Sequence, residues 1–144
     1  MEIIGVIAEY NPFHNGHLYQ INKIRELYPD SIIIVVLNGY FLQRGEMSIL
    51  SKEEKTKLAL DYGVNIVVEL PFVFGCQAAD IFANTSIKLL NELKITKLIF
   101  GSESDNIHTL EQIAKKQINS ELDIKKYLDE GMNYPTAFKN ALII

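Results

Sequence analysis

Cysteine is nearly absent from this 144-residue sequence, and long apolar runs are absent altogether. The single thiol, Cys76, has no partner for an internal disulfide, which favours a reducing compartment. No apolar run approaches the ~20 residues that span a bilayer, so we expect no membrane association. The beginning of the sequence carries Glu2 and lacks the basic region of a signal peptide. These absences together predict a cytoplasmic protein.

Basic residues are not in excess either, since 14 Lys and Arg stand against 18 Asp and Glu, for a formal net charge of −4. Bulk charge therefore gives no argument for nucleic-acid binding, although a local basic patch stays compatible with it. The sequence contains no internal repeat and no low-complexity tract. With 48% hydrophobic residues, a chain of this length can form one ordered domain around a real core.

Four short apolar runs recur along the sequence, at residues 3–9, 31–38, 64–70 and 96–101. Each is rich in Ile, Val, Leu or Phe and does not alternate with polar residues. Strands that are buried on both faces, as in a parallel sheet, have this pattern. Helical patterns lie between the runs, at residues 15–28, 51–63 and 77–94. The alternation predicts an α/β fold with a doubly wound, Rossmann-like parallel sheet.

The predicted helices carry their own boundary and core signals. Ser51 and Glu54 have the spacing of a capping box, and Gly63 is a predicted C-cap. Apolar residues at helical spacing are expected to face the core. They are Leu18, Ile21, Ile24 and Leu27 in the first helix, and Ile81, Phe82, Ile87, Leu90 and Leu93 in the third.

The pattern changes from Asn106 onward, where helical periodicity continues but no fifth apolar strand follows. Breaks are expected near Asn119 and Gly131. The sequence therefore predicts a core at residues 1–105 that contains the doubly wound sheet. Residues 106–144 are expected to form a helical extension, the C-terminal helices of the fold.

Ligands of open α/β sheets bind beyond the carboxyl ends of the strands. Four segments of this sequence are expected there, at residues 9–17, 38–46, 69–74 and 101–105. All four contain polar residues or glycine where a plain connector would not need them. Their convergence favours a nucleotide or phosphate ligand.

Two of the three histidines, His14 and His17, lie in the turn after the first predicted strand. A helix is expected to begin near Asn15 or Gly16, and free backbone N–H groups and the helix dipole favour anions at its start. Two imidazole donors there suit phosphate oxygens whose charge grows in a transition state. Gly16 keeps a side chain out of the approach, and Pro12 fixes the entry of the loop.

A structural interpretation of the same turn is that His14 caps the helix and His17 is a half-buried filler. For one histidine alone we prefer that interpretation, but the pair in one turn favours phosphate binding. A zinc site is disfavoured, because Cys76 and His108 are not obvious further ligands.

Three further residues are candidates at the ends of the other strands. Arg44 can hold a phosphate or carboxylate with two hydrogen bonds, or else pair with Glu46 at the surface. Glu69 can position a substrate or bind loop backbone. Gly101 leaves space for an adenine or ribose, or simply forms a tight turn.

The string HNGH at residues 14–17 resembles the HxGH motif of the nucleotidyltransferase superfamily, which is related to class I aminoacyl-tRNA synthetases. Longer strings are more specific, and they occur in the order EYNPFHNGH, FLQRGE, VELPFVF and FGSES. Together they resemble the tRNA(Met) cytidine acetate ligase family over most of the sequence. Members of that family adenylate acetate with ATP and then acetylate N4 of the wobble cytidine of elongator tRNA(Met).

The resemblance implies an HxGH-type fold and an ATP cradle in which His14 and His17 stabilise the α-phosphate and the leaving pyrophosphate. It implies Gly101 at the adenosine and Arg44 as a further catalytic residue. ATP, Mg²⁺, acetate and elongator tRNA(Met) are the implied ligands and partners, with no dedicated protein metal site. The cradle residues are Ile7, Ala8, Glu9, Tyr10, Asn11, Pro12, Phe13, His14, Asn15, Gly16, His17, Leu18, Tyr19 and Gln20.

Members of that family are considerably longer, so the sequence is expected to match their N-terminal part. Residues 106–144 would begin a C-terminal part that supplies further nucleotide contacts and tRNA-binding surface. Where the family usually has Arg, this sequence has Lys55. A small-molecule nucleotidyltransferase and an ATP-binding fragment without catalysis are the alternatives, and no oligomeric state is predicted.

Overall fold

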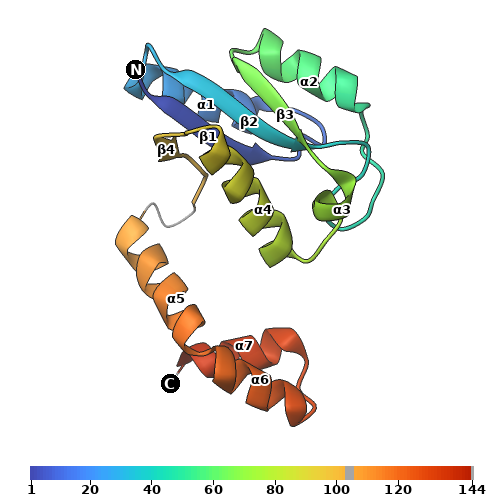
Figure 1. The fold of residues 1–144 in the computed structure, drawn as a ribbon, viewed down its shortest axis with the longest axis vertical. Coiled ribbons are helices and arrows are strands. Elements are labelled where there is room, and N and C mark those ends of the chain that lie inside the picture. The colour runs from blue at the N-terminus through green and yellow to red at the C-terminus, as the bar shows by residue number, and fades with distance from the viewer. Residues whose placement is uncertain (103–105, 144) are drawn as a thin grey trace. The chain divides into compact units, whose positions relative to one another are not determined.

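A computed structural model describes residues 1–102 and 106–143 of the chain (Figure 1). The chain forms two compact units, Met1–Gly101 and Ser102–Ile144. The predicted boundary at residue 105 and the last part of the predicted 101–105 segment lie outside the described residues. Among the residues that are described, no helix is both long and apolar enough to cross a membrane.

The first unit is built on one parallel sheet of strands β1 (Ile3–Ala8), β2 (Ile32–Asn38), β3 (Ile66–Leu70) and β4 (Lys97–Leu98). Their order across the sheet is β3-β2-β1-β4, and each neighbouring pair is parallel. The predicted parallel α/β fold is confirmed. The fourth strand is shorter than its apolar run, because only Ile4 and Gly5 of β1 pair with it, at Lys97 and Leu98.

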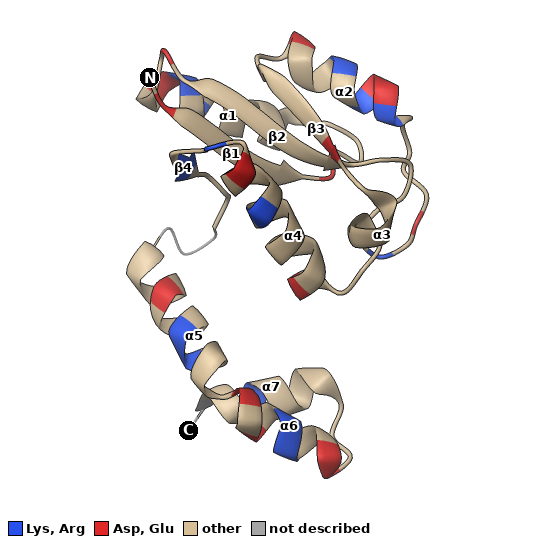
Figure 2. Ribbon diagram, viewed as in Figure 1, with Lys and Arg blue, Asp and Glu red and all other residues tan. Residues whose placement is uncertain are grey.

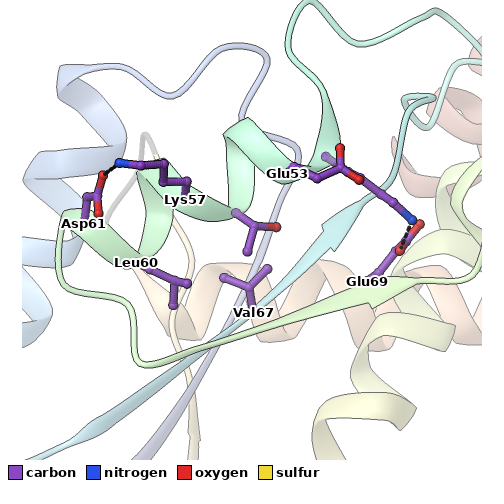
Figure 3. Close-up of a pocket in the computed structure, with 8 residues that line it drawn as sticks. Glu53, Lys57, Leu60, Asp61, Val67 and Glu69 are labelled. Carbon is purple, nitrogen blue, oxygen red and sulfur yellow. Dashed lines mark hydrogen bonds and ion pairs between the residues drawn. The ribbon is translucent and has the colours of Figure 1, made fainter.

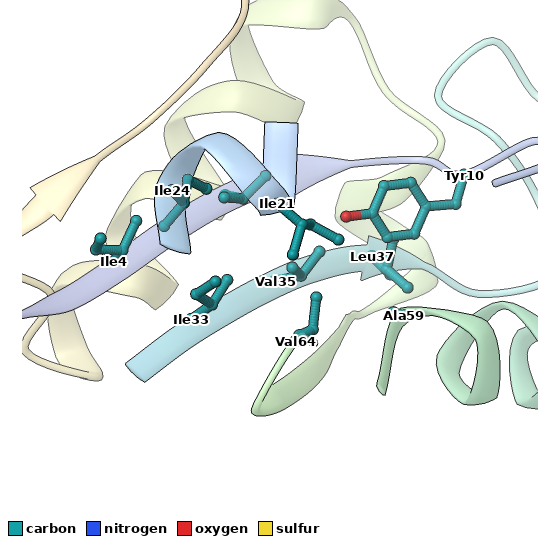
Figure 4. Close-up of a cluster of buried hydrophobic side chains, with 10 residues drawn as sticks. Ile4, Tyr10, Ile21, Ile24, Ile33, Val35, Leu37, Ala59 and Val64 are labelled. Atoms are coloured by element: carbon teal, nitrogen blue, oxygen red, sulfur yellow. The ribbon is translucent and has the colours of Figure 1, made fainter. Parts of the chain in front are cut away.

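Helices cover both faces of this sheet (Figure 1). They are α1 (Asn15–Leu27), α2 (Lys52–Asp61), the short α3 (Phe72–Gly75) and α4 (Ala79–Glu92). Residues alternate along β2, so that Ile33 and Val35 pack with α1 and α2 while Ile34 and Val36 pack with α4. Figure 4 shows the first of these clusters. The sheet therefore has an apolar core on each face, as a doubly wound fold requires.

The predicted core faces of the helices are partly wrong. Ile21 and Ile24 of α1 are buried, but Leu27 is 57% exposed. In α4 the buried positions are Ser86 and Leu90, with Phe82 packed beside them, whereas Ile81, Ile87 and Leu93 are exposed. Four-residue steps place positions 82, 86 and 90 on one face of the helix, and that face alone meets the sheet.

The second unit contains only helices among its described residues. They are α5 (Ile107–Asn119), α6 (Glu121–Asp129) and α7 (Tyr134–Ile143), which confirms the predicted breaks. Ile124, Ala137 and Ala141 form a small core of this unit. Figure 2 shows acidic and basic residues interspersed on α2 and on α6, so neither helix carries a face of one charge.

Candidate functional site

The two histidines predicted to bind phosphate lie at the start of α1 and cap it reciprocally. The Nδ1 atom of His14 accepts a hydrogen bond from the backbone N–H of Gly16 at 3.0 Å, and Nδ1 of His17 accepts from the backbone N–H of His14 at 3.2 Å. This is a capping box in which imidazoles replace the usual hydroxyl and carboxylate. The two rings stack with centroids 3.8 Å apart.

Capping decides which ring nitrogen carries the proton. Because each Nδ1 accepts a backbone N–H, the neutral ring of His14 and of His17 holds its proton on Nε2. No described residue hydrogen-bonds to either Nε2, so both are available as donors to a ligand. The pair thus presents two directed N–H groups at the start of the helix, where the helix dipole also favours an anion.

Gly16 has a reason to be glycine that differs from the predicted one. A Cβ at this position would lie 2.9 Å from Cε1 and 3.1 Å from Nδ1 of His14. Glycine therefore makes room for the capping ring, in addition to any room it leaves for a phosphate.

Aromatic side chains surround His17 on the side away from solvent. The ring of Tyr10 lies 4.7 Å and that of Phe13 5.6 Å from the His17 ring, between centroids. Burial, and then the neighbouring His14, lower the pKa of His17. Both the lowered pKa and the capping bond favour a neutral imidazole, which donates through Nε2 without carrying charge.

Tyr10 is itself buried in the core cluster shown in Figure 4. Its backbone φ of 47° lies in the left-handed region, which a large side chain rarely adopts. Burial raises the pKa of its hydroxyl to about 12. That hydroxyl has no hydrogen-bond partner among the described residues. Such local strain concentrates at functional sites.

Side chains of the turn tie it to the loop that follows β2. One carboxylate oxygen of Glu9 accepts from Nδ2 of Asn38 at 2.9 Å and from the backbone N–H of Gln43 at 2.6 Å. The side-chain oxygen of Asn11 accepts from the backbone N–H of Ile49 at 2.7 Å. The predicted segments after β1 and β2 therefore form one hydrogen-bonded assembly.

Arg44 stands at the exposed tip of this second loop. The loop closes on itself where the backbone N–H of Leu42 donates to the carbonyl of Glu46 at 2.8 Å, and Gly45 adopts a φ of 84°. The Arg44 guanidinium makes no hydrogen bond or ion pair to any residue that the structure describes, so the alternative pairing with Glu46 does not form. Its catalytic role stays a prediction.

Lys55 is a residue that the sequence analysis did not place in the site. It is 0% exposed, and its Nζ donates to the carbonyls of Gly39, Asn38 and Glu9 at 2.9, 3.0 and 3.3 Å. Its ammonium thus holds together the carboxyl ends of β1 and β2. Desolvation lowers the pKa of Lys55. The available signal was its four-residue spacing from the buried Ala59 on the inner face of α2.

The rest of the predicted ATP cradle divides between core and surface. Ile7 and Ala8 pack into the clusters on opposite faces of the sheet, and Tyr19 is exposed on α1. Pro12 follows a cis peptide bond, and Leu18 and Gln20 are half-buried. A Cβ at Gly101 would meet nothing within 4 Å, so glycine is not required there by packing. The ligand contacts assigned to these residues stay predictions.

Two hollows reach Glu69, near the carboxyl end of β3. One of about 540 Å³ runs between α2 and β3 (Figure 3), with an ion pair between Lys57 and Asp61 and another between Lys52 and Glu69 at 2.8 Å. It contains none of the predicted site residues apart from Glu69. A second hollow of about 220 Å³ lies beyond the ends of β2 and β3 and is also lined by Glu69.

The fold and the capped histidine turn define a class of protein. A family model described as HIGH nucleotidyl transferase matches residues 1–144, and the chain belongs to this family. This confirms the nucleotidyltransferase resemblance carried by the HNGH turn.

Similar proteins narrow the resemblance to tRNA(Met) cytidine acetate ligases. The one from Fusobacterium nucleatum is 47% identical over 142 residues, which is 97% of this chain and 36% of that relative. The one from Mycoplasma mobile is 47% identical over 96% of this chain and 48% of its own length. The chain therefore spans about a third to a half of these curated relatives, as expected from its length.

Solved structures of a third relative share the fold. Thermotoga maritima TmcAL bound with α-thio ATP superposes with a TM-score of 0.87 at 39% identity, covering 99% of this chain and 36% of that one. Its apo form gives a TM-score of 0.88 at the same identity, over 99% of this chain and 35% of that one.

Proposed function

We propose that this chain binds ATP at the HNGH turn and adenylates acetate, which is the first half of the reaction of a tRNA(Met) cytidine acetate ligase. The observation that carries the proposal is the His14–His17 pair, whose capping bonds leave both Nε2–H groups available at a helix start. Support for ATP comes from the similar Thermotoga maritima protein, which was crystallised with α-thio ATP.

In the proposed step an acetate oxygen attacks the α-phosphorus, the bond from that phosphorus to the bridging oxygen breaks, and pyrophosphate leaves. Negative charge grows on the phosphate oxygens as this happens. The two Nε2–H groups and the positive end of the α1 dipole are fixed before the reaction, so they stabilise that charge without reorganising. Gly101 is proposed to lie against the adenosine, and Arg44 is free to reach a phosphate or the acetate.

Mg²⁺ is proposed to arrive on the triphosphate. Among the described residues no group of three or more His, Cys, Asp or Glu side chains could hold a metal ion. Mg²⁺ commonly keeps its waters and binds through substrate phosphates, where it neutralises their charge.

Transfer of the acetyl group to cytidine N4 of tRNA(Met) is proposed for a longer protein that includes this chain. The relatives named for that reaction are two to three times as long as the segment they share with it. The mixed charge of α2 and α6 offers no continuous basic surface for RNA on those helices.

The test is ATP–pyrophosphate exchange by the 144-residue chain with and without acetate. His17→Ala is the informative variant, because it removes the imidazole donor and puts no other donor in its place. We expect exchange to fall about 10²–10³-fold in this variant, the usual loss for a preorganised donor.

His17→Gln is the matched control, since the glutamine oxygen can keep the capping bond and its amide still offers an N–H donor. We expect a smaller loss of exchange in His17→Gln, and lower stability only in His17→Ala, by about 1 kcal/mol. Unchanged exchange in His17→Ala would contradict the catalytic assignment. ATP binding without exchange in the unaltered chain would leave a nucleotide-binding module, and exchange driven by phosphorylated acceptors in place of acetate would favour a small-molecule nucleotidyltransferase.

A further inference from the structure

The second hollow lies on the same edge of the sheet as the HNGH turn, beyond the ends of β2 and β3. Its volume is about 220 Å³. The strand β2 lies beside β1, and the Asn38 side chain at its end bonds directly to Glu9. The residues that line the hollow are Gly39, Tyr40, Phe41, Glu69, Leu70 and Phe72, with Gly75.

Aromatic side chains with unusually large exposure form the walls of this hollow. Tyr40 is 49%, Phe41 38% and Phe72 62% exposed. The rings of Phe41 and Phe72 meet edge to face with centroids 5.5 Å apart. Exposed aromatic rings gathered in one concave site are what proteins use to stack unpaired nucleobases.

Glu69 is the charged residue among those that line this hollow. One oxygen of Glu69 binds Nζ of Lys52 at 2.8 Å, which leaves Oε1 for another donor. A Cβ at Gly39 would lie only 2.5 Å from Oε1, so glycine at this position makes room for the carboxylate. An ionised carboxylate only accepts hydrogen bonds, and it therefore selects a ligand that presents a donor, such as an exocyclic amine.

We propose that this hollow receives the cytosine base of the acceptor RNA, with the ring stacked on Phe72 and Phe41 and the N4 amine donating to Oε1 of Glu69. This inference rests on the proposed function, because the relatives named for cytidine identify which amine-bearing base is meant. Uracil has a carbonyl oxygen where cytosine has the amine, so the Glu69 carboxylate repels it. The hollow would thus distinguish the two pyrimidines.

Chemical-shift titration of the ¹⁵N-labelled chain with cytidine and with uridine tests the subsite. We expect cytidine to shift the amides of Gly39, Glu69 and Phe72 and to bind at least tenfold more tightly than uridine. In Glu69→Gln the amide can serve either base, and the preference should fall to about threefold or less. Phe72→Ala should weaken both nucleosides about equally, by roughly tenfold, as loss of one stacking ring does.

Gly39→Ala is a second way to remove the carboxylate, since the new methyl group displaces the end of a flexible side chain rather than backbone. It should abolish the preference for cytidine while the chain stays folded. Leu27→Ala is the matched control, an exposed apolar residue at the end of α1 away from the HNGH turn. It should leave both affinities unchanged.

Equal affinity for cytidine and uridine would overturn the inference, as would shifts that map to Gly101, or no shifts up to the solubility limit of cytidine. Acetate-dependent exchange by the unaltered chain is measured separately. A cytidine-selective hollow without exchange would contradict the proposed function alone, and exchange without a selective hollow would contradict the subsite alone.

Discussion

Replacing Lys55 with Met should lower the free energy of unfolding of the first unit, and the hydrogen bonds of Lys55 allow the size of the change to be estimated. The two shorter bonds, to Gly39 at 2.9 Å and Asn38 at 3.0 Å, involve a charged donor and contribute about 1.5–3 kcal/mol each. Relief of the buried charge and the packing of Met offset part of this loss. We expect a net destabilisation of about 3 kcal/mol, since removing the buried ammonium leaves the carbonyls that it binds without their donor.

Urea unfolding followed by circular dichroism measures this change. With a slope of about 1–3 kcal/mol per molar urea, the midpoint of Lys55→Met should fall by roughly 1–3 M. Lys57→Met is the matched control on the same helix, because its ammonium is exposed and pairs with Asp61 one turn away. An exposed pair of this kind contributes about 0.5 kcal/mol or less.

Lys55→Arg tests whether the site requires an ammonium group in particular or only hydrogen-bond donors. Guanidinium offers five N–H groups to the same three carbonyls, so we expect this variant to recover at least half of the stability that Lys55→Met loses. If Lys55→Met unfolded at the same urea concentration as Lys57→Met, the idea that Lys55 holds the ends of β1 and β2 together would be refuted.

Three smaller changes test the surroundings of the histidine pair. Tyr10→Phe removes a buried hydroxyl that has no hydrogen-bond partner among the described residues, so the free energy of unfolding should rise by about 1 kcal/mol. In a calorimetric scan the melting temperature should rise by about 4–8 °C, and a lower one would mean that the hydroxyl is hydrogen-bonded. The pKa of His17 is lower in the folded chain, so the unfolded chain binds more protons just below about pH 6.5, and the free energy of unfolding should fall with acidification there. Urea midpoints at several pH values should show this loss in the wild type and less of it in His17→Gln. Gly16→Ala should leave the urea midpoint nearly unchanged, since the better helix propensity of alanine offsets the disturbed cap. The affinity for ATP, measured by calorimetry, should fall roughly tenfold, and an unaltered affinity would show that the His14 ring tolerates the methyl group.

The place of the candidate site was predictable because local rules determine it. Strand and helix periodicity locate the turn after β1, and His14, Gly16 and His17 fall at the start of α1 whatever the rest of the chain does. The structural and functional interpretations of His14 are both compatible with the geometry. An imidazole has two nitrogens, so capping occupies Nδ1 and leaves Nε2 for a ligand.

Other parts of the site were not predictable, because they depend on tertiary contacts. Lys55 stands within a charged run and looks like a solvated residue until α2 is laid over the ends of β1 and β2. Likewise, Ile87 has helical spacing with other apolar residues, yet only the face that holds Ser86 and Leu90 meets the sheet. Periodicity identifies an apolar stripe, whereas the width of the neighbouring sheet decides how much of it is buried.

The unequal pairing of β1 with its two neighbours has a consequence for how a nucleotide would be held. β1 is paired with β2 from Ile3 to Ala8, whereas its register pairs with β4 are limited to Ile4 and Gly5. Local opening is easiest where few backbone bonds must break, so the amides of β4 should exchange with solvent faster than those of β1. If adenosine lies against Gly101, the phosphates bind next to the fully paired strand β1. The adenosine then binds next to β4, the strand with the fewest pairs. Occupation by ATP would then slow exchange along β4 and leave that of β1 unchanged, and base recognition would be accompanied by an unfavourable ordering entropy.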